Sequence, residues 1–183
     1  MFEILHFQDS EKILKEKRLL KDVQATMQYI DDVLAGSLYK RELLRMALDE
    51  MDWTEDADNM RIIEGRRYMY KGVKRGVAID GNISAYEYIL EGLVRLQIGY
   101  DKQRIDAGIL LVNSKRSEKS PFGTTTDLIK AEIETLYPTI SLPVAVCLIS
   151  TGEPILYDEE GNPYGSVSVS KDDKSGVEKA AEG

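Results

Sequence analysis

The stretch GVAIDGNISAYEYILEGLVRLQIGYDKQRIDAGILLV, from Gly76 to Val112, decides the fold. Its first residues, 76–82, predict a strand, and Ile105–Val112 predicts another. Between them, Ser84 and Glu87 have the spacing of a capping box, which predicts a helix that continues to Ile98 and ends at Gly99. The apolar residues of this helix cover more than one face, so we expect most of it to be buried. They are Tyr86, Ile89, Leu90, Leu93, Val94 and Leu96. A strand, a helix and a second strand favour an α/β fold.

The residues before this stretch predict a strand and two helices. The strand is Phe2–Phe7, and either Asp9 or Ser10 can cap a single long helix that ends at Gly36. The second helix runs from Leu38 to Met51. The apolar stripe of the first helix consists of Ile13, Leu20, Val23, Met27, Ile30 and Leu34. An acidic loop or linker around Trp53, residues 50–58, follows the helices.

Two strand pairs are predicted on either side of the central stretch. Residues 61–73 predict a strand that a turn at 74–76 connects to 76–82. Residues 153–169 predict a hairpin around 160–162. The last residues, 171–183, contain too little apolar surface to fold and predict a disordered tail.

Downstream of Val112, the sequence predicts a loop, a helix and a buried strand. The loop is the polar segment 114–126, and the helix spans 126–137 and stops before Pro138. The apolar run 142–149 is typical of a strand that is buried on both faces. We therefore expect one domain over residues 1–170, with a mainly helical part at 1–58, a core at 60–157 and a mixed sheet that has helices on both sides.

The composition indicates an ordinary globular protein. The chain has 183 residues, of which 43% are hydrophobic and 31% are charged. The longest apolar run is far shorter than the ~18 residues of a membrane span, and the first residues lack the features of a secretory signal. With a single cysteine, Cys147, there is no intrachain disulfide, so we expect a soluble protein in the cytoplasm.

The charge and the motif content exclude several function classes. A net charge of −8 argues against a general nucleic-acid binder, although it leaves room for a local basic face. The only histidine, His6, has no Cys or His partner, which argues against a zinc site or a catalytic triad. Neither GxGxxG nor GxxxxGK[ST] occurs, so P-loop nucleotide hydrolysis is excluded.

Asp80 and Asn82, at the end of the strand 76–82, are candidate catalytic residues. Side chains two residues apart on a strand point to the same face, so both could reach one Mg²⁺ ion and its water. The alternative is a tight turn, because Asp-Gly is a common turn dipeptide. The capping box at Ser84 favours a strand that leads into a helix.

Two groups of polar residues are candidate DNA contacts. The first group precedes or adjoins the Asp80 strand, where its cations could bind phosphates or protect a solvated sheet edge. It consists of Arg66, Arg67, Lys71, Lys74 and Arg75. The second group lies in the loop 114–126, which could contact a DNA groove or be an ordinary surface loop. It consists of Lys115, Arg116, Lys119, Ser120 and Thr124.

The chain between Arg67 and Ile149 resembles the BglII/BstYI type of restriction endonucleases, members of the PD-(D/E)xK nuclease group. GVAIDGN resembles the catalytic strand of this family, and SAYEYILEGLVRLQIGY resembles the helix that follows it. RIDAGILLVNSK resembles the next strand and its exit loop, and SLPVAVCLIS resembles the late core strand. With the N-terminal strand and helix, the resemblance extends to about residue 157. RIDAGILLV is its most specific part.

The resemblance implies a restriction-endonuclease-like α/β core, with a mixed central sheet flanked by helices. It also implies a homodimer that cleaves double-stranded DNA with Mg²⁺. Asp80 matches the second metal-binding acid, where the family normally has Glu, and Asn82 matches the residue that positions or activates the water. The first metal-binding Asp should lie on the preceding strand, but the sequence there is Tyr68-Met69-Tyr70-Lys71. Glu64 is the only acid that we can suggest as its replacement.

These observations leave three hypotheses. The chain could be a Mg²⁺-dependent endonuclease whose activity is weak or lost, with Asp80 and Glu64 as metal ligands and Asn82 orienting the water. It could be a catalytically inactive protein of the same fold that binds DNA, RNA or a protein partner. In the third hypothesis, the apolar stripe of the first helix is a dimerisation face and the protein is mainly structural.

Overall fold

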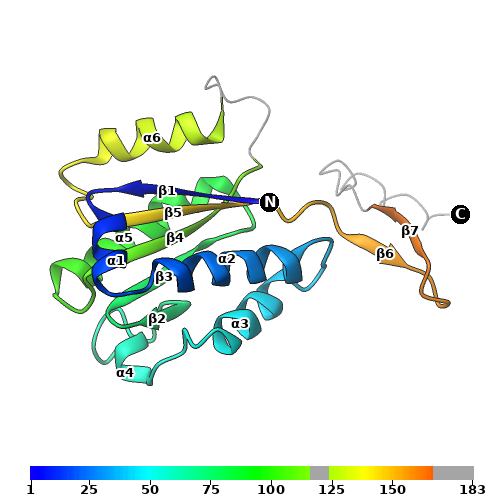
Figure 1. Cartoon of the computed structure of the whole chain (residues 1–183), viewed down its shortest axis with the longest axis horizontal. Coiled ribbons are helices and arrows are strands. Elements are labelled where there is room, and N and C mark those ends of the chain that lie inside the picture. The colour runs from blue at the N-terminus through cyan, green and yellow to red at the C-terminus, as the bar shows by residue number, and fades with distance from the viewer. Residues whose placement is uncertain (116–123, 167–183) are drawn as a thin grey trace, which may run out of the picture.

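The computed structural model describes residues 1–115 and 124–166, which form a five-stranded mixed sheet with helices on both faces (Figure 1). Across the sheet, the order is β1-β5-β4-β3-β2. The strands are β1 Phe2–Phe7, β2 Gly72–Lys74, β3 Val77–Asn82, β4 Ala107–Asn113 and β5 Val144–Ile149. The three central strands are parallel, whereas β1 and β2 are antiparallel to their neighbours. The predicted mixed sheet is therefore observed.

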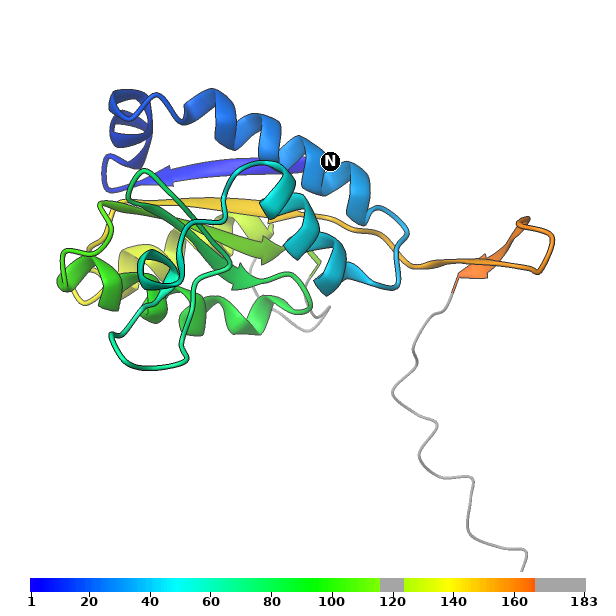
Figure 2. The same cartoon turned by 90° about the horizontal axis from the view of Figure 1, so that it is seen from below.

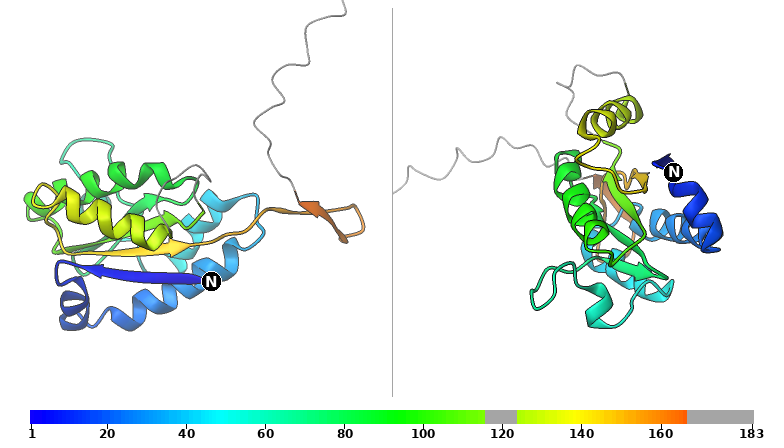
Figure 3. Two further views of the ribbon diagram at one scale, coloured as in Figure 1. Left: turned by 90° about the horizontal axis from the view of Figure 1, so that it is seen from above. Right: turned by 90° about the vertical axis from the view of Figure 1, so that its left-hand side faces the viewer.

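Helices cover the two faces of the sheet in separate layers (Figure 3). α1 (Ser10–Glu16), α2 (Leu20–Leu34) and α3 (Lys40–Glu50) belong to one layer. α5 (Ile89–Asp101) and α6 (Thr125–Leu136) belong to the other. A buried apolar cluster lies on each face, and the central strands contribute alternate residues to the two clusters.

The strand β5 and its neighbour β4 have the apolar composition of strands that are covered on both sides. All six residues of β5 are buried, including Cys147, whose thiol pKa burial raises to about 12. The predicted burial of 142–149 is confirmed, although the strand begins only at Val144. The parallel pairing of β3 with β4 from Val77 to Asn82 shows that Asp80-Gly81 is no hairpin turn.

The prediction of a single long N-terminal helix is wrong, because the chain forms two helices there, α1 and α2. Arg18, between α1 and α2, has a φ of +57° that a helix interior does not accommodate, and Leu19 beside it is fully buried. Asp9 makes no side-chain capping bond. Gly36, with a φ of +66°, ends the second helix as predicted. Most of the predicted stripe packs against the sheet: Leu20 is half-buried, and Val23, Met27, Ile30 and Leu34 are fully buried. It therefore offers no free dimerisation face.

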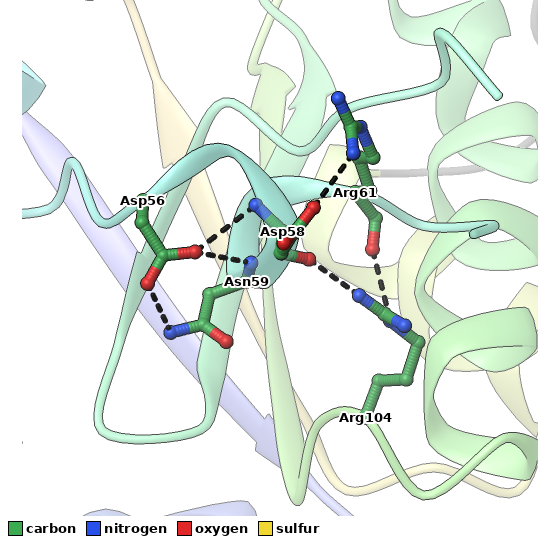
Figure 4. A network of polar contacts seen from close by, with 5 residues as sticks. All are labelled: Asp56, Asp58, Asn59, Arg61 and Arg104. Atoms are coloured by element: carbon green, nitrogen blue, oxygen red, sulfur yellow. Dashed lines mark hydrogen bonds and ion pairs between the residues drawn. The ribbon is translucent and has the colours of Figure 1, made fainter. Parts of the chain in front are cut away.

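The prediction of a strand at 61–73 is also wrong for most of this range. Only its end belongs to a strand, the three-residue β2. Residues 61–71 instead form a connection, here called the 61–71 loop, that begins after the short helix α4 (Ala57–Met60). Asp56 caps α4 by accepting from the backbone N–H groups of Asp58 and Asn59 (Figure 4). Arg104, just beyond α5, donates to the Asp58 carbonyl and, at 3.0 Å, to the Arg61 carbonyl. One end of the loop is thereby fixed to the body of the protein.

The predicted capping box at Ser84 and Glu87 is not formed. Residues Tyr86–Tyr88 form a 3₁₀ helix, η1, and α5 begins at Ile89 and continues past Gly99 to Asp101. The expectation that most of this helix is buried is confirmed for Tyr86, Ile89, Leu93 and Leu96. It is wrong for Leu90 and Val94, which are 50% and 42% exposed. One face of α5 is therefore apolar and open.

The C-terminal hairpin is present as β6 (Ile155–Tyr157) and β7 (Pro163–Ser166), and it projects from the sheet (Figures 1 and 2). The end of the predicted hairpin and the predicted tail lie outside the described residues. Within the described residues, no helix is both long and apolar enough to cross a membrane.

Candidate functional site

Asp80 lies on β3, the strand next to the edge strand β2, on the face of the sheet that α5 covers. Its strand neighbours Val77 and Ile79 face the opposite layer, whereas Ala78 faces the same cluster as α5. Only 3% of Asp80 is exposed to solvent. A carboxylate at this depth requires compensating donors or a compensating charge.

Two glycines allow close packing beside Asp80, Gly81 of β3 against β4 and Gly92 of α5 against β3. A Cβ on Gly81, whose φ is +114°, would lie 2.2 Å from the Leu111 carbonyl oxygen. A Cβ on Gly92 of α5 would lie 3.2 Å from the Cα of Gly81. The Asp80-Gly81 pair that resembled a turn is thus a place of close packing in a strand.

Both carboxylate oxygens of Asp80 are engaged by neighbouring donors. Oδ1 accepts from the backbone N–H of Gly81 at 2.8 Å. Oδ2 accepts from Nε of Arg95, on α5, at 2.6 Å, which forms an ion pair. The same guanidinium donates to the Met69 carbonyl at 2.5 Å. Arg95 therefore neutralises Asp80 and connects it to the 61–71 loop.

A small cavity of about 120 Å³, the Asp80 cavity, opens beside this ion pair. Its lining residues are Lys71, Asp80, Gly81, Asn82, Tyr88, Glu91, Gly92 and Arg95. Asn82 shares the cavity with Asp80, as the strand periodicity predicted, but its Oδ1 accepts from the backbone N–H of Ser84 at 2.8 Å. Lys71 is placed there because its backbone N–H donates to the Ile79 carbonyl next to Asp80.

A larger cleft of about 730 Å³, the basic cleft, adjoins the Asp80 cavity and shares Lys71 and Arg95 with it. It lies between α3 and the 61–71 loop. Its charged lining residues are Arg41, Glu42, Arg45, Asp49, Arg67, Lys71 and Arg95. Four of these cations are exposed and form no ion pair or side-chain hydrogen bond within the described part of the chain, namely Arg41, Arg45, Arg67 and Lys71.

Of the predicted cations of the first group, only Arg67 and Lys71 line the basic cleft. Arg66 is exposed on the same loop. Lys74 is engaged elsewhere: it pairs with Asp22 at 3.1 Å and lies over the ring of Trp53. Arg75 donates to the Lys17 carbonyl at 3.1 Å. Lys74 and Arg75 therefore stabilise the fold.

The predicted contacts in the second group are not brought together at the cleft. Lys115 pairs with Glu153, and Thr124 caps α6 by accepting from the backbone N–H of Asp127. Arg116, Lys119 and Ser120 lie outside the described residues.

Glu64, the predicted second acid, is exposed on the 61–71 loop and lines neither the Asp80 cavity nor the basic cleft. The second acid that lines the Asp80 cavity is Glu91. Sequence reasoning missed Glu91, Arg95, Arg41 and Arg45. The i, i+4 spacing of Arg41 and Arg45 was a signal that they share one face of a helix.

The side chains at Asp80 do not fit a magnesium ion. Mg²⁺ needs near-octahedral oxygen ligands and usually one or two free carboxylates. Here the Asp80 oxygens accept from Gly81 and Arg95, and Lys71 adds a second cation to the same cavity. Within residues 1–115 and 124–166, no group of three or more His, Cys, Asp or Glu side chains could hold a metal ion.

Tyr70 offers no general base to this site. Burial, with a smaller contribution from the negative charge of Asp80, raises the Tyr70 pKa to about 12. The hydroxyl therefore stays protonated at neutral pH, and it donates to the Arg95 carbonyl at 3.3 Å. Tyr70 thus helps to hold the loop against α5.

Comparison with known proteins shows the fold. No protein-family model and no curated protein sequence matches the chain. The crystal structure of restriction endonuclease BglII complexed with a DNA 16-mer is similar, with a TM-score of 0.59 and 12% identity over 89% of this chain and 85% of that one. The crystal structure of free BglII is similar with a TM-score of 0.52 and 12% identity, over 90% of this chain and 91% of that one. The predicted restriction-endonuclease-like α/β fold is thereby confirmed.

Proposed function

We propose that this chain binds double-stranded DNA in the basic cleft and does not cleave it with Mg²⁺ at Asp80. The observation that carries the proposal is the ion pair between Asp80 and Arg95, at 2.6 Å, inside the nuclease-like sheet. A carboxylate that is neutralised by arginine and buried beside a second cation is poorly suited to bind a metal. The cations around it are suited to bind phosphates.

The charge distribution supports DNA as the ligand. The chain as a whole has a net charge of −8. The basic cleft nevertheless combines the two acids Glu42 and Asp49 with four cations that have no partner among residues 1–115 and 124–166. Cations held on one surface of an acidic protein are typical of a local phosphate-binding face. BglII, which has the same fold, was crystallised with DNA, and this lends further support.

One observation favours the alternative of a Mg²⁺-dependent endonuclease. Asp80, Asn82 and Glu91 line one cavity, so three oxygen-bearing side chains are close together. This activity would require Arg95 to leave Asp80, which would bury an uncompensated carboxylate until a metal arrived. The ion pair makes this the weaker candidate.

The four unpaired cations should each contribute to a salt-dependent affinity. Replacing Arg41, Arg45, Arg67 and Lys71 by glutamine together should reduce the slope of log K against log salt by up to about four, because each phosphate contact releases condensed counterions. Binding of a fluorescent duplex at several salt concentrations measures the slope. Lys12→Gln and Lys130→Gln, on exposed lysines outside the cleft, serve as matched controls and should leave the slope unchanged. Salt-insensitive binding by the wild type, or equal slopes for the cleft variant and the controls, would exclude this cleft as the DNA site.

We also propose that the chain forms a homodimer through the exposed face of α5. Leu90, Val94 and Ile98 have the i, i+4, i+8 spacing of one helix face and line an apolar groove of about 500 Å³ with Ile63 and Tyr68. Such a face can pack against its own copy around a two-fold axis.

Replacing Val94 by glutamate should convert this dimer into a monomer, because a charge would be buried at the centre of the interface. Light scattering after size-exclusion chromatography gives the mass. Leu38→Glu, at a residue that is 55% exposed outside the groove, should remain dimeric. A wild type that is monomeric at high concentration would contradict the dimer.

A further inference from the structure

We infer that Arg95 is a positioning residue for DNA binding: it uses the buried charge of Asp80 as an anchor and fixes the 61–71 loop, which carries Arg67 and Lys71 into the basic cleft. The inference rests on the proposed function and adds a role for the Asp80–Arg95 pair, which would otherwise only compensate a buried charge.

The geometry of one guanidinium provides the link. Nε of Arg95 donates to Asp80 Oδ2 at 2.6 Å, and a terminal nitrogen donates to the Met69 carbonyl at 2.5 Å. A planar guanidinium with several fixed donors can bind two acceptors in different directions, which a lysine ammonium does with less geometric control. Arg95 therefore connects β3 to the loop through a single rigid group.

Beyond Met69 the loop is held independently, because the Tyr70 N–H donates to the Met60 carbonyl and the Lys71 N–H to the Ile79 carbonyl, both at 2.9 Å. The part before Met69 has few other attachments. A bridge between Arg61 and Met69 and the hydrogen bond from the Ile62 N–H to the Tyr68 carbonyl, at 2.9 Å, close it upon itself. Arg104 holds its first residue. Residues 64–69 are exposed, so the Met69 carbonyl is the point at which Arg95 fixes the cation-bearing side of the loop.

The anchor is strong because Asp80 cannot readily lose its partner. The side chain of Asp80 is 4% exposed and that of Arg95 is 27% exposed. A buried carboxylate that loses its cation is left without compensation, so Arg95 is held in one orientation. The direction in which it presents its remaining donor to Met69 is fixed as a consequence.

Replacing Asp80 by alanine distinguishes this role from simple electrostatics. The variant raises the net charge of the site by one, so electrostatics alone predicts tighter DNA binding. The positioning role predicts the opposite, with duplex binding weakened about tenfold, a typical coupling between linked sites. It also predicts faster cleavage by trypsin after Arg66 and Arg67, because a loop without its anchor opens more often.

Two further variants keep the test decisive. Asp80→Asn removes the same charge as Asp80→Ala but keeps one acceptor oxygen for the two donors, the Gly81 N–H and Arg95 Nε. It should therefore bind DNA and resist trypsin less well than the wild type but better than Asp80→Ala. Arg95→Lys retains the charge but loses the second direction of donation, and it should behave like Asp80→Ala. Circular dichroism confirms that each variant is folded, and Arg95→Lys replaces Asp80→Ala if the latter does not fold.

The inference is overturned if Asp80→Ala, or Arg95→Lys in its place, binds DNA as tightly as the wild type and resists trypsin equally. A wild type that does not bind duplex DNA would contradict the proposed function instead. In that case the trypsin rates of the variants still show whether Arg95 fixes the loop.

Discussion

Replacing Gly81 by alanine should lower the free energy of unfolding by about 2–5 kcal/mol, which combines ~1–2 kcal/mol for a side chain at positive φ with ~1–3 kcal/mol for overpacking. The new Cβ would lie 2.2 Å from the carbonyl oxygen of Leu111 on the neighbouring strand. Backbone on β4 cannot move without disturbing the ladder that holds β3, β4 and β5 together. Urea unfolding followed by circular dichroism measures the loss.

Gly152→Ala is the matched control for the cost of positive φ. Gly152 has a φ of +67°, but an added Cβ would meet nothing within 4 Å. Its loss should be limited to about 1–2 kcal/mol. If Gly81→Ala and Gly152→Ala unfolded at the same urea concentration, β3 and β4 would not approach each other closely at Gly81. The placement of Asp80 would then be contradicted as well.

The combination of Lys71→Asp and Arg95→Gln should create a metal site where the natural chain has none. The first substitution introduces a carboxylate into the Asp80 cavity, and the second frees Asp80 from its ion pair. With Glu91 in the same cavity, three carboxylates could then provide the hard oxygen ligands that Mg²⁺ and Mn²⁺ prefer. We expect a dissociation constant for Mn²⁺ on the order of 1 mM, within the range of weak carboxylate sites. Titration followed by the paramagnetic signal of free Mn²⁺ measures it.

Two further variants separate the contributions to this site. Lys71→Asp alone should bind little Mn²⁺, because Arg95 still occupies Asp80. Adding Asp80→Asn to the double variant should abolish binding. Binding of Mn²⁺ by the unaltered protein, lost on Asp80→Asn, would show that the ion pair opens readily and would favour the endonuclease alternative.

The sheet could be predicted well because its signals are local. The continuous apolar run at 142–149 indicated the buried strand β5, and the strand–helix–strand order around Gly81 indicated β4 and the α/β fold. The same residues carried the resemblance to restriction endonucleases, and the structural similarity to BglII supports that fold. Strand periodicity alone predicted that Asp80 and Asn82 lie on the same face, and both line the Asp80 cavity.

The remaining features depend on contacts between residues far apart in the sequence. The break between α1 and α2 follows from the burial of Leu19, which no helical periodicity reveals. The partner of Asp80 is fifteen residues away on a helix, so the sequence could show that an acid was missing but not that Arg95 had taken up the charge. The open face of α5 at Leu90 and Val94 was missed, because apolar residues on more than one face of a helix are equally consistent with burial of those faces.

The most direct test of the central claim is duplex-DNA binding by the unaltered protein, first in excess EDTA and then in excess Mg²⁺ at matched ionic strength, with the DNA examined on a denaturing gel. The ion pair at Asp80 predicts equal affinities in the two conditions and intact strands in both. Binding that requires Mg²⁺, or strands that are cut when Mg²⁺ is present, would show that Asp80 serves a metal ion and would contradict the account.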